Sequence, residues 1–224
     1  MRRSKLGLLY VDELIGYYKS KLMLVLWVGL PLLSFLMQYL NPDLEGFPVS
    51  TFVAILVGSI GGTLSSVMLS TTITAERNRN VYDLFLIRPV KRWELLTAKF
   101  FAVLTCLLLA VVISIVMGIV VDVIKIGTPI VELLQTNLES LMVALATISI
   151  ACSIGVFFGT LINSVAVSAV LSVYLGNQLS AIIILPTVLI TGINIILYAV
   201  LAGVGVTLLI MTVSIVIFTK KSQY

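Results

Sequence analysis

The side chains that could do chemistry in this 224-residue chain lie in two places. The first is a row of hydroxyl groups in an otherwise apolar run, formed by Ser59, Thr63, Ser66 and Ser70. On a helix these positions fall within about 60° of one another, so the row could line a polar pathway. It could equally bond to a neighbouring helix, which is the commoner use in membranes. The second place is the highly charged segment 76–99, which could bind another protein or lipid headgroups.

Most enzymatic chemistry is excluded by what the sequence lacks. There is no histidine, which excludes imidazole-based catalytic dyads, haem ligation and the usual zinc sites. Neither a G-x-x-x-x-G-K-[ST] phosphate loop nor a G-x-S-x-G nucleophile elbow occurs. The acids closest to an apolar run on the basic side, Glu76, Asp83 and Glu94, lie among basic residues. We therefore expect no catalytic residue, no metal site and no cofactor on this chain, and a membrane-embedded enzyme is the weaker alternative.

The elements that must position these residues are strongly apolar. Hydrophobic residues make up 60% of the chain and charged residues only 11%, against roughly 25% charged in an ordinary soluble domain. The mean hydropathy is +1.18. Lipid must therefore surround most of the surface, which predicts an all-α membrane protein with a single transmembrane domain over residues 1–224. Charge-free stretches, at roughly 20 residues per crossing, predict six transmembrane helices at 22–41, 51–75, 100–121, 140–162, 165–185 and 193–218.

The last charge-free stretch, residues 140–219, must hold three of these helices because it is far longer than one crossing. Breaks are expected at 163–164 and in the region from Pro186 to Asn194. Since broken helices at membrane depth are tolerated when they are buried in protein or face water, we predict an irregular outer-leaflet segment within 177–194.

The basic residues predict the orientation. Only Lys125 lies on the opposite side from the others, and the positive-inside rule assigns the basic side to the cytoplasm. An even number of spans then puts both termini in the cytoplasm. Attraction to anionic lipid accounts for the net charge of +4, so no nucleic-acid partner is expected. The residues on the basic side are Arg2, Arg3, Lys5, Lys19, Lys21, Arg77, Arg79, Arg88, Lys91, Arg92, Lys99, Lys220 and Lys221.

Residues 5–20 have the pattern of an amphipathic helix that lies on the inner membrane surface, although a plain juxtamembrane linker is the alternative. In this pattern Asp12, Glu13 and Lys19 are left for water and headgroups. The apolar positions that recur at helical spacing are Leu6, Leu9, Leu14 and Tyr17.

Two rows of small residues at a spacing of four predict surfaces where helices pack closely. The rows are Ala151, Gly155 and Gly159 in the fourth predicted span, and Ser164, Ser168 and Ser172 at the start of the fifth.

The charged segment 76–99 predicts a docking element. Pro89 disfavours helix at Arg88, so one short helix should end there and a second should lead into the third span. The first helix would be a compact amphipathic projection suited to a groove on another protein, although a solvated linker against lipid headgroups is the alternative. Its apolar face consists of Val81, Leu84 and Phe85, with Tyr82 and Leu86 beside it, and its charges are Arg77, Arg79 and Asp83.

This segment resembles the coupling region of permease subunits from type-2 ATP-binding-cassette exporters. Those subunits typically carry an acidic–basic start, a Gly-Thr, an acidic residue with leucines, a proline after a small polar residue, and a Gly-Lys that opens the third helix. The resemblance in sequence covers about a tenth of the chain. It rests on Glu76, Arg77, Asp83, Leu84, Leu86, Pro89, Val90, Arg92, Glu94, Leu95, Leu96 and Lys99, and the chain departs from it at Asn80–Val81, Arg88 and Ala98.

The resemblance implies a permease subunit of an ATP-driven exporter in the plasma membrane of a prokaryotic cell. Two permease copies, identical or different, would form the substrate pathway. Two separate ATPase subunits, which bind ATP and Mg²⁺, would dock on the charged segments. The residues assigned to ATPase docking are Glu76, Arg77, Arg79, Val81, Tyr82, Asp83, Leu84, Phe85, Leu86, Arg88 and Pro89.

The predicted spans contain no ionisable acid or base, which agrees with an energy source outside the bilayer. Proton-driven carriers usually hold Asp, Glu or His in the membrane because those groups carry the coupling. An ion-coupled carrier or channel that acts without an ATPase is the other alternative, since carbonyls and hydroxyls can form a sodium site. Short outer loops leave little room for a docked solute-binding protein and favour export over import.

Overall fold

The computed structural model describes residues 5–40, 49–79, 92–126, 130–189 and 194–221. No strand occurs among these residues, so the prediction of an all-α protein is confirmed for them. The helices are α1 (Lys5–Tyr18), α2 (Lys21–Leu40), α3 (Val49–Asn78), α5 (Arg92–Ile126), α6 (Ile130–Leu161), α7 (Val165–Leu189) and α8 (Ile195–Lys221).

Within the described residues, four helical segments are long and apolar enough to cross a membrane. The apolar segments found in α2 and α7 are shorter, at Met23–Leu32 and Val165–Ala181. The chain is therefore a multi-pass membrane protein, and the number of six spans stays a prediction. The four long segments are Leu56–Asn78 in α3, Trp93–Val120 in α5, Asn137–Leu161 in α6 and Ile195–Thr219 in α8.

Helices α3 and α5 extend beyond the predicted spans into charged sequence. α3 continues through Glu76 and Arg77 to Asn78, and α5 begins at Arg92, before Lys99. Hydropathy marks where a helix leaves lipid, whereas the helix itself continues as long as its backbone bonds and polar side chains are satisfied. The charged ends of these two helices form the region that matters most for function.

The two breaks predicted in the last apolar stretch have different outcomes. The break at 163–164 is confirmed, because α6 and α7 are separate helices on either side of it. The irregular segment expected within 177–194 is wrong for 177–189, which continue α7 as a helix with Pro186 inside it. Residues 190–193 lie outside the described part of the chain. A proline removes one backbone hydrogen bond, but in apolar surroundings the remaining backbone groups are best satisfied by staying helical.

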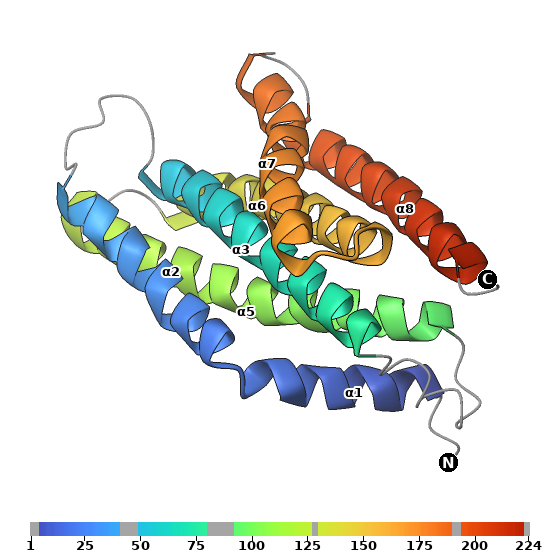
Figure 1. The fold of residues 1–224 in the computed structure, drawn as a ribbon. Coiled ribbons are helices and arrows are strands. Elements are labelled where there is room, and N and C mark those ends of the chain that lie inside the picture. Colours follow the sequence, from blue (N-terminus) through green and yellow to red (C-terminus); the bar gives the residue numbers. More distant parts are fainter. Residues whose placement is uncertain (1–4, 41–48, 80–91, 127–129, 190–193, 222–224) are drawn as a thin grey trace.

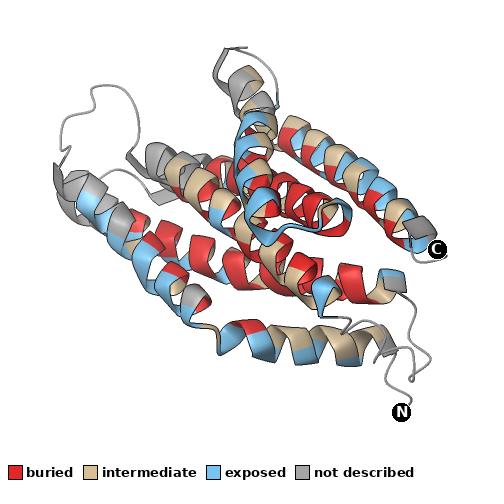
Figure 2. Ribbon diagram, viewed as in Figure 1, coloured by how far each residue is buried: buried red, intermediate tan, exposed pale blue. Residues whose placement is uncertain are grey.

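Helix α6 is the central helix of the bundle (Figure 1). Helices α3, α7 and α8 pack around it, while α1 and α2 pack mainly on α5. In the span of α6, 72% of residues are buried inside the protein, against 22% in the span of α8. Figure 2 shows buried residues along α6 and exposed residues on the outward faces of α2 and α8. α6 therefore organises the packing of its neighbours.

The buried apolar residues form two clusters that meet at α6. One cluster joins α1, α2, α3 and α5, includes Ile148 and Val156 of α6, and reaches Met211 and Phe218 of α8. The other joins α6 to α7 and α8 and includes Ile150 and Ile154. Because the two pairs on α6 lie on different faces of one helix, α6 connects the two halves of the bundle.

Small residues bring α3 and α6 into close backbone contact. A Cβ atom added at Gly155 would lie 2.5 Å from the carbonyl oxygen of Ser66, and one added at Gly159 would lie 3.2 Å from the Cα atom of Ser70. The side chain of Ala151 faces Gly62 of α3. The packing surface predicted from the first row of small residues is thus confirmed.

Candidate functional site at the charged end of the bundle

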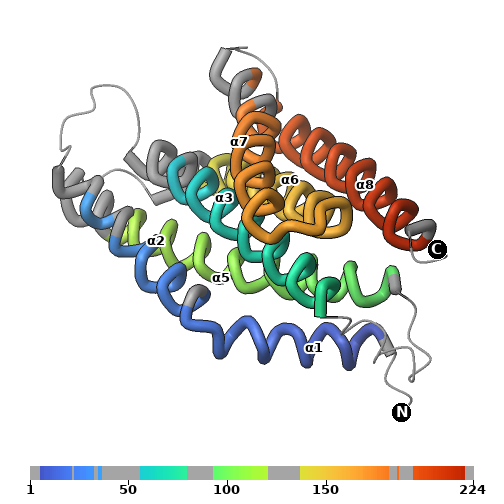
Figure 3. Tube along the Cα trace, in the orientation of Figure 1, coloured from blue at the N-terminus to red at the C-terminus, as the bar shows by residue number. Residues whose placement is uncertain are grey.

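We call the charged segment 76–99 the coupling segment. The charged residues at its two ends meet α1 at one end of the bundle. α3 ends there at Asn78 and α5 begins there at Arg92, with α1 packed against α5 (Figure 3). We call this region the charged end; it contains Glu13 of α1, Glu76 and Arg77 of α3, and Lys99 of α5.

A buried ammonium group lies between two carboxylates at the charged end. The Nζ atom of Lys99 is 2.7 Å from Oε1 of Glu13 and 2.8 Å from Oε1 of Glu76. The Lys99 side chain is only 3% exposed, whereas the two glutamates are 23% and 26% exposed. A lysine buried to this degree requires charged partners, since removing an ammonium from water is costly. The cluster joins three helices, and its formal charge is −1.

The position of Glu13 corrects the sequence prediction. We expected Glu13 to face water and headgroups together with Asp12, but it turns toward α5 and pairs with Lys99. Its neighbour Asp12 is exposed as predicted. An amphipathic pattern places a glutamate at the edge of a polar face, but it contains no information on a buried lysine in a distant helix.

A cavity of about 280 Å³ opens beside this ion-pair cluster, between α1, α3 and α5. The phenol ring of Tyr17 lines it and is 6% exposed. Within the described part of the chain, the Tyr17 hydroxyl makes no hydrogen bond of normal geometry. Burial, reinforced by the nearby charges of Glu13 and Glu76, raises the pKa of the Tyr17 phenol, so it stays protonated at physiological pH. The other residues that line the cavity are Glu13, Gly16, Ser20, Met68, Thr71, Thr72, Glu76 and Lys99.

Hydrogen bonds join the last turn of α3 to the connection between α6 and α7. The guanidinium of Arg77 donates hydrogen bonds to the carbonyl oxygens of Thr160 and Ile162 and to the side-chain oxygen of Asn163. The side-chain amide of Asn78 donates to the carbonyl oxygen of Asn163 at 2.7 Å. A cation at this place satisfies carbonyl groups at the carboxyl end of α6 and opposes the negative end of its dipole.

The row of hydroxyls on α3 divides into a buried pair and a partly exposed pair. Ser66 and Ser70 are fully buried between α3 and its neighbours, and the Ser66 hydroxyl lies 3.4 Å from the carbonyl oxygen of Ser172 in α7. Ser59 and Thr63 are half-buried. Ser66 thus contributes to helix packing within one chain, and the pathway role of the row stays a prediction.

The row of serines on α7 packs against α3 over part of its length. Ser168 and Ser172 are fully buried, and the hydroxyl of Thr74 on α3 donates to that of Ser168 at 3.3 Å. Ser164, the first of the row, is exposed. The predicted packing surface is confirmed for the two buried serines.

Of the residues assigned to ATPase docking, only those at the end of α3 are described. Glu76 and Arg77 take part in the contacts above, and Arg79 is exposed just beyond the helix. The docking role therefore stays a prediction. The assigned residues that lie outside the described part are Val81, Tyr82, Asp83, Leu84, Phe85, Leu86, Arg88 and Pro89.

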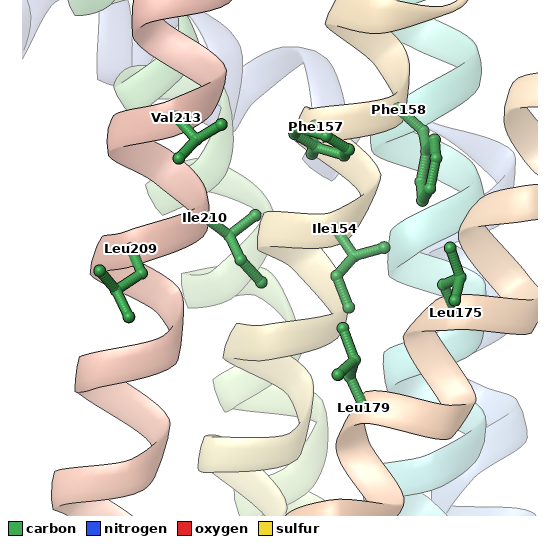
Figure 4. Close-up of a pocket in the computed structure, with 8 residues that line it drawn as sticks. All are labelled: Ile154, Phe157, Phe158, Leu175, Leu179, Leu209, Ile210 and Val213. Carbon is green, nitrogen blue, oxygen red and sulfur yellow. The ribbon is translucent and has the colours of Figure 1, made fainter.

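A second cavity, of about 310 Å³, lies on α6 between α7 and α8 (Figure 4). All eight side chains that line it are apolar, so it can hold hydrocarbon but offers no polar side chain that would orient a charged substrate. They are Ile154, Phe157, Phe158, Leu175, Leu179, Leu209, Ile210 and Val213.

The chain matches the model of a known protein family. The model of the ABC-2 family transporter protein matches residues 33–194, which is more than two thirds of the chain and runs from α2 to the residue before α8. Comparison with curated proteins finds no match.

Proposed function

Because the chain belongs to the ABC-2 family of transporter proteins, we propose that it is the permease subunit of an ATP-driven exporter. A separate ATPase would bind ATP and Mg²⁺ and carry out hydrolysis. Six helices would cross the plasma membrane of a prokaryotic cell, with both termini in the cytoplasm. The charged end of the bundle would then face the ATPase.

The observation that carries this proposal is the way in which both sides of the coupling segment are fixed to the bundle. On the α5 side, the Lys99 ammonium pairs with Glu13 of α1 and with Glu76 of α3. On the α3 side, Arg77 and Asn78 are hydrogen-bonded to the connection between α6 and α7. A displacement of the segment would therefore reach α1, α6 and α7 directly.

This arrangement supports a mechanism in which force enters at the charged end. ATP-driven closure of two ATPase subunits would push on the segment between α3 and α5. The close α3–α6 contact at Gly155 would make these two helices move as one body, since packed backbones resist continuous deformation. The permease would then switch between inward-facing and outward-facing states. The apolar spans need no proton-coupling acid, because the energy comes from the ATPase.

A second permease copy would cover a polar face of α7. Tyr174 is 62% exposed, and Asn177 and Gln178 are exposed on the same helical face. Polar side chains inside a membrane usually face protein or a water-filled cavity rather than lipid. The substrate pathway would run between the two copies, with the half-buried Ser59 and Thr63 of α3 among its lining.

Introduction of two negative charges on the predicted docking helix tests the proposal. The double substitution Leu84→Asp and Phe85→Asp puts two carboxylates on the apolar face of the coupling segment. We expect it to abolish co-purification with the ATPase encoded beside the gene and to remove stimulated ATP hydrolysis, because a hydrophobic docking face cannot bury two charges. The matched control is Ile126→Asp with Ile130→Asp, which adds the same charges in the predicted outer loop and should leave ATPase association unchanged.

Two outcomes would contradict the proposal. If the Leu84→Asp, Phe85→Asp variant retained wild-type ATPase association, the coupling segment would not be the docking element. If the purified chain moved substrate in liposomes driven by an ion gradient with no ATPase present, the alternative of an ion-coupled carrier would hold.

A further inference from the structure

The cavity under α1 contains a polar atom that the described protein leaves unsatisfied. The Tyr17 hydroxyl is buried and forms no hydrogen bond of normal geometry with described residues, although it lines a space of about 280 Å³. Its polar neighbour in the cavity wall, the Thr72 hydroxyl, donates to the carbonyl oxygen of Met68 at 2.6 Å instead. An unpaired buried hydroxyl destabilises the fold, and buried polar groups in native proteins normally have partners. A phenol can both donate and accept one hydrogen bond, so it would suit a ligand that enters this space.

The charge around the cavity selects a ligand with a single positive charge. Glu13 and Glu76 contribute two carboxylates and Lys99 one ammonium, which leaves a formal charge of −1. Lys99 is paired through the Oε1 atom of each glutamate, so acceptor capacity remains on both carboxylates. A divalent metal fits poorly, because Lys99 would repel it and the described residues contain no group of three acidic or sulfur ligands. A primary ammonium, with three N–H donors, matches the acceptors.

Two basic residues lie next to the cavity in the sequence. Ser20 lines the cavity, and it stands between Lys19 and Lys21, both of which are exposed. The outer face of α1 carries exposed apolar residues, among them Leu8 and Val11, as expected for a helix in contact with lipid. The cavity thus combines an acidic lining with exposed lysines and an apolar helix face close to it in the chain.

We propose that this cavity binds the headgroup of an ethanolamine phospholipid, with the ammonium between Tyr17, Glu13 and Glu76 and the phosphate toward Lys19 and Lys21. The short ethanolamine bridge keeps the two charges of the headgroup a few bond lengths apart, which matches an acidic cavity with lysines close to it in the chain. Choline headgroups would bind weakly, since a quaternary ammonium has no N–H to donate. Glycerol headgroups lack the positive charge. Such a lipid would hold α1 against α3 and α5.

Lipid-dependent stability of the purified full-length chain, with any partner that co-purifies, tests this site. Ethanolamine, choline and glycerol phospholipids with identical acyl chains are titrated separately, and the midpoint of thermal unfolding is followed for each. Soluble glycerophosphoethanolamine is titrated in parallel to separate the lipid from its free headgroup. We expect only the ethanolamine lipid to raise the midpoint strongly, because ligands that bind the folded state alone stabilise it.

Tyr17→Phe is the decisive variant, since it removes one oxygen atom and keeps the ring. We expect it to weaken binding of the ethanolamine lipid roughly tenfold, as for loss of a hydrogen bond to a charged group. Without lipid its unfolding midpoint should equal or exceed that of the wild type, because an unpaired buried hydroxyl is gone. The matched control Tyr18→Phe changes an exposed neighbour and should bind as the wild type does. Glu13→Gln should weaken binding, whereas Asp12→Asn, at an exposed carboxylate, should not.

Three results would overturn the proposal: equal stabilisation by choline and ethanolamine lipids, wild-type lipid affinity in Tyr17→Phe, or equally tight binding of the soluble headgroup. The assay needs no ATPase and no substrate, so its outcome is independent of whether the chain works as an exporter subunit.

Discussion

Replacing Lys99 with methionine removes the ammonium that holds the charged end together while it keeps a side chain of similar length. The carboxylate oxygens of Glu13 and Glu76 are then at most about 5.5 Å apart, since each lies 2.7 or 2.8 Å from the same nitrogen atom. At this distance two unit charges repel each other by about 0.8 kcal/mol in bulk water and by about 3 kcal/mol at an effective dielectric constant near 20. Three helices would lose their common partner.

The net loss of stability should lie between these limits. Both glutamates are about a quarter exposed and can turn toward water, so screening reduces the repulsion. The apolar methionine side chain is stable in the buried position of Lys99, whose side chain is only 3% exposed, so its burial offsets part of the lost stability. We expect Lys99→Met to lower the free energy of unfolding by roughly 2 kcal/mol, which corresponds to roughly 4–8 °C in the melting midpoint for a chain of this size.

Thermal unfolding followed by tryptophan fluorescence measures this effect, with Lys19→Met as the matched control. Lys19 is exposed on the same N-terminal segment, so in detergent without added phospholipid its substitution should stay within about 0.5 kcal/mol of the wild type. The triple variant Lys99→Met, Glu13→Gln, Glu76→Gln should recover most of the loss, because the repelling charges are gone. A Lys99→Met midpoint equal to that of Lys19→Met, or a triple variant no more stable than the single one, would refute the ion-pair reasoning.

Two further substitutions test the contacts that would transmit movement from the charged end. Gly155→Ala puts a methyl group 2.5 Å from a backbone oxygen of α3, so it should destabilise the chain by about 1–3 kcal/mol in a thermal melt. The control is Gly205→Ala in α8, where nothing lies within 4 Å, and it should be neutral or slightly stabilising. Equal melting midpoints for the two variants would argue against the close α3–α6 contact. Arg77→Ala deletes charge-assisted hydrogen bonds to the α6–α7 connection. It should increase hydrogen exchange at the carboxyl end of α6 and lower the free energy of unfolding by about 2–3 kcal/mol. The control Arg79→Ala, at an exposed position, should leave that exchange unchanged.

The helical fold could be predicted because membrane-spanning helices require long runs of residues without charge. Charge-free runs predicted a helical membrane protein, and the row with Gly155 identified the α3–α6 contact, since only small residues allow backbones so close. The ends of the helices were harder to predict from the sequence. The sequence predicts a break at Pro186, but α7 continues through it as a helix. Inside a membrane no water is present to bond the backbone N–H and C=O groups that a break would expose, so the helical conformation is favoured.

The candidate site could be predicted only in part. Glu76, Arg77 and Lys99 stand out in the sequence as the edges of a charged segment, but their partners do not. Glu13 is far from Lys99 in the chain, and Asn163 is far from Arg77. Such pairs form when tertiary packing brings distant helices together, and a single sequence records hydrophobic periodicity but not the distance between two helices. The unsatisfied hydroxyl of Tyr17 is likewise visible only in three dimensions.

The unequal burial of α6 and α8 has a consequence for how this chain can vary over evolutionary time. Nearly three quarters of the α6 span faces other helices, whereas the α8 span turns most of its surface outward. Outward positions such as Leu201 and Leu208 are exposed on this subunit, so in a bilayer any apolar side chain should be tolerated there. Homologous chains should therefore drift freely along α8 while α6 stays nearly fixed, and the helix that accumulates fewest changes will be the one that joins both halves of the bundle.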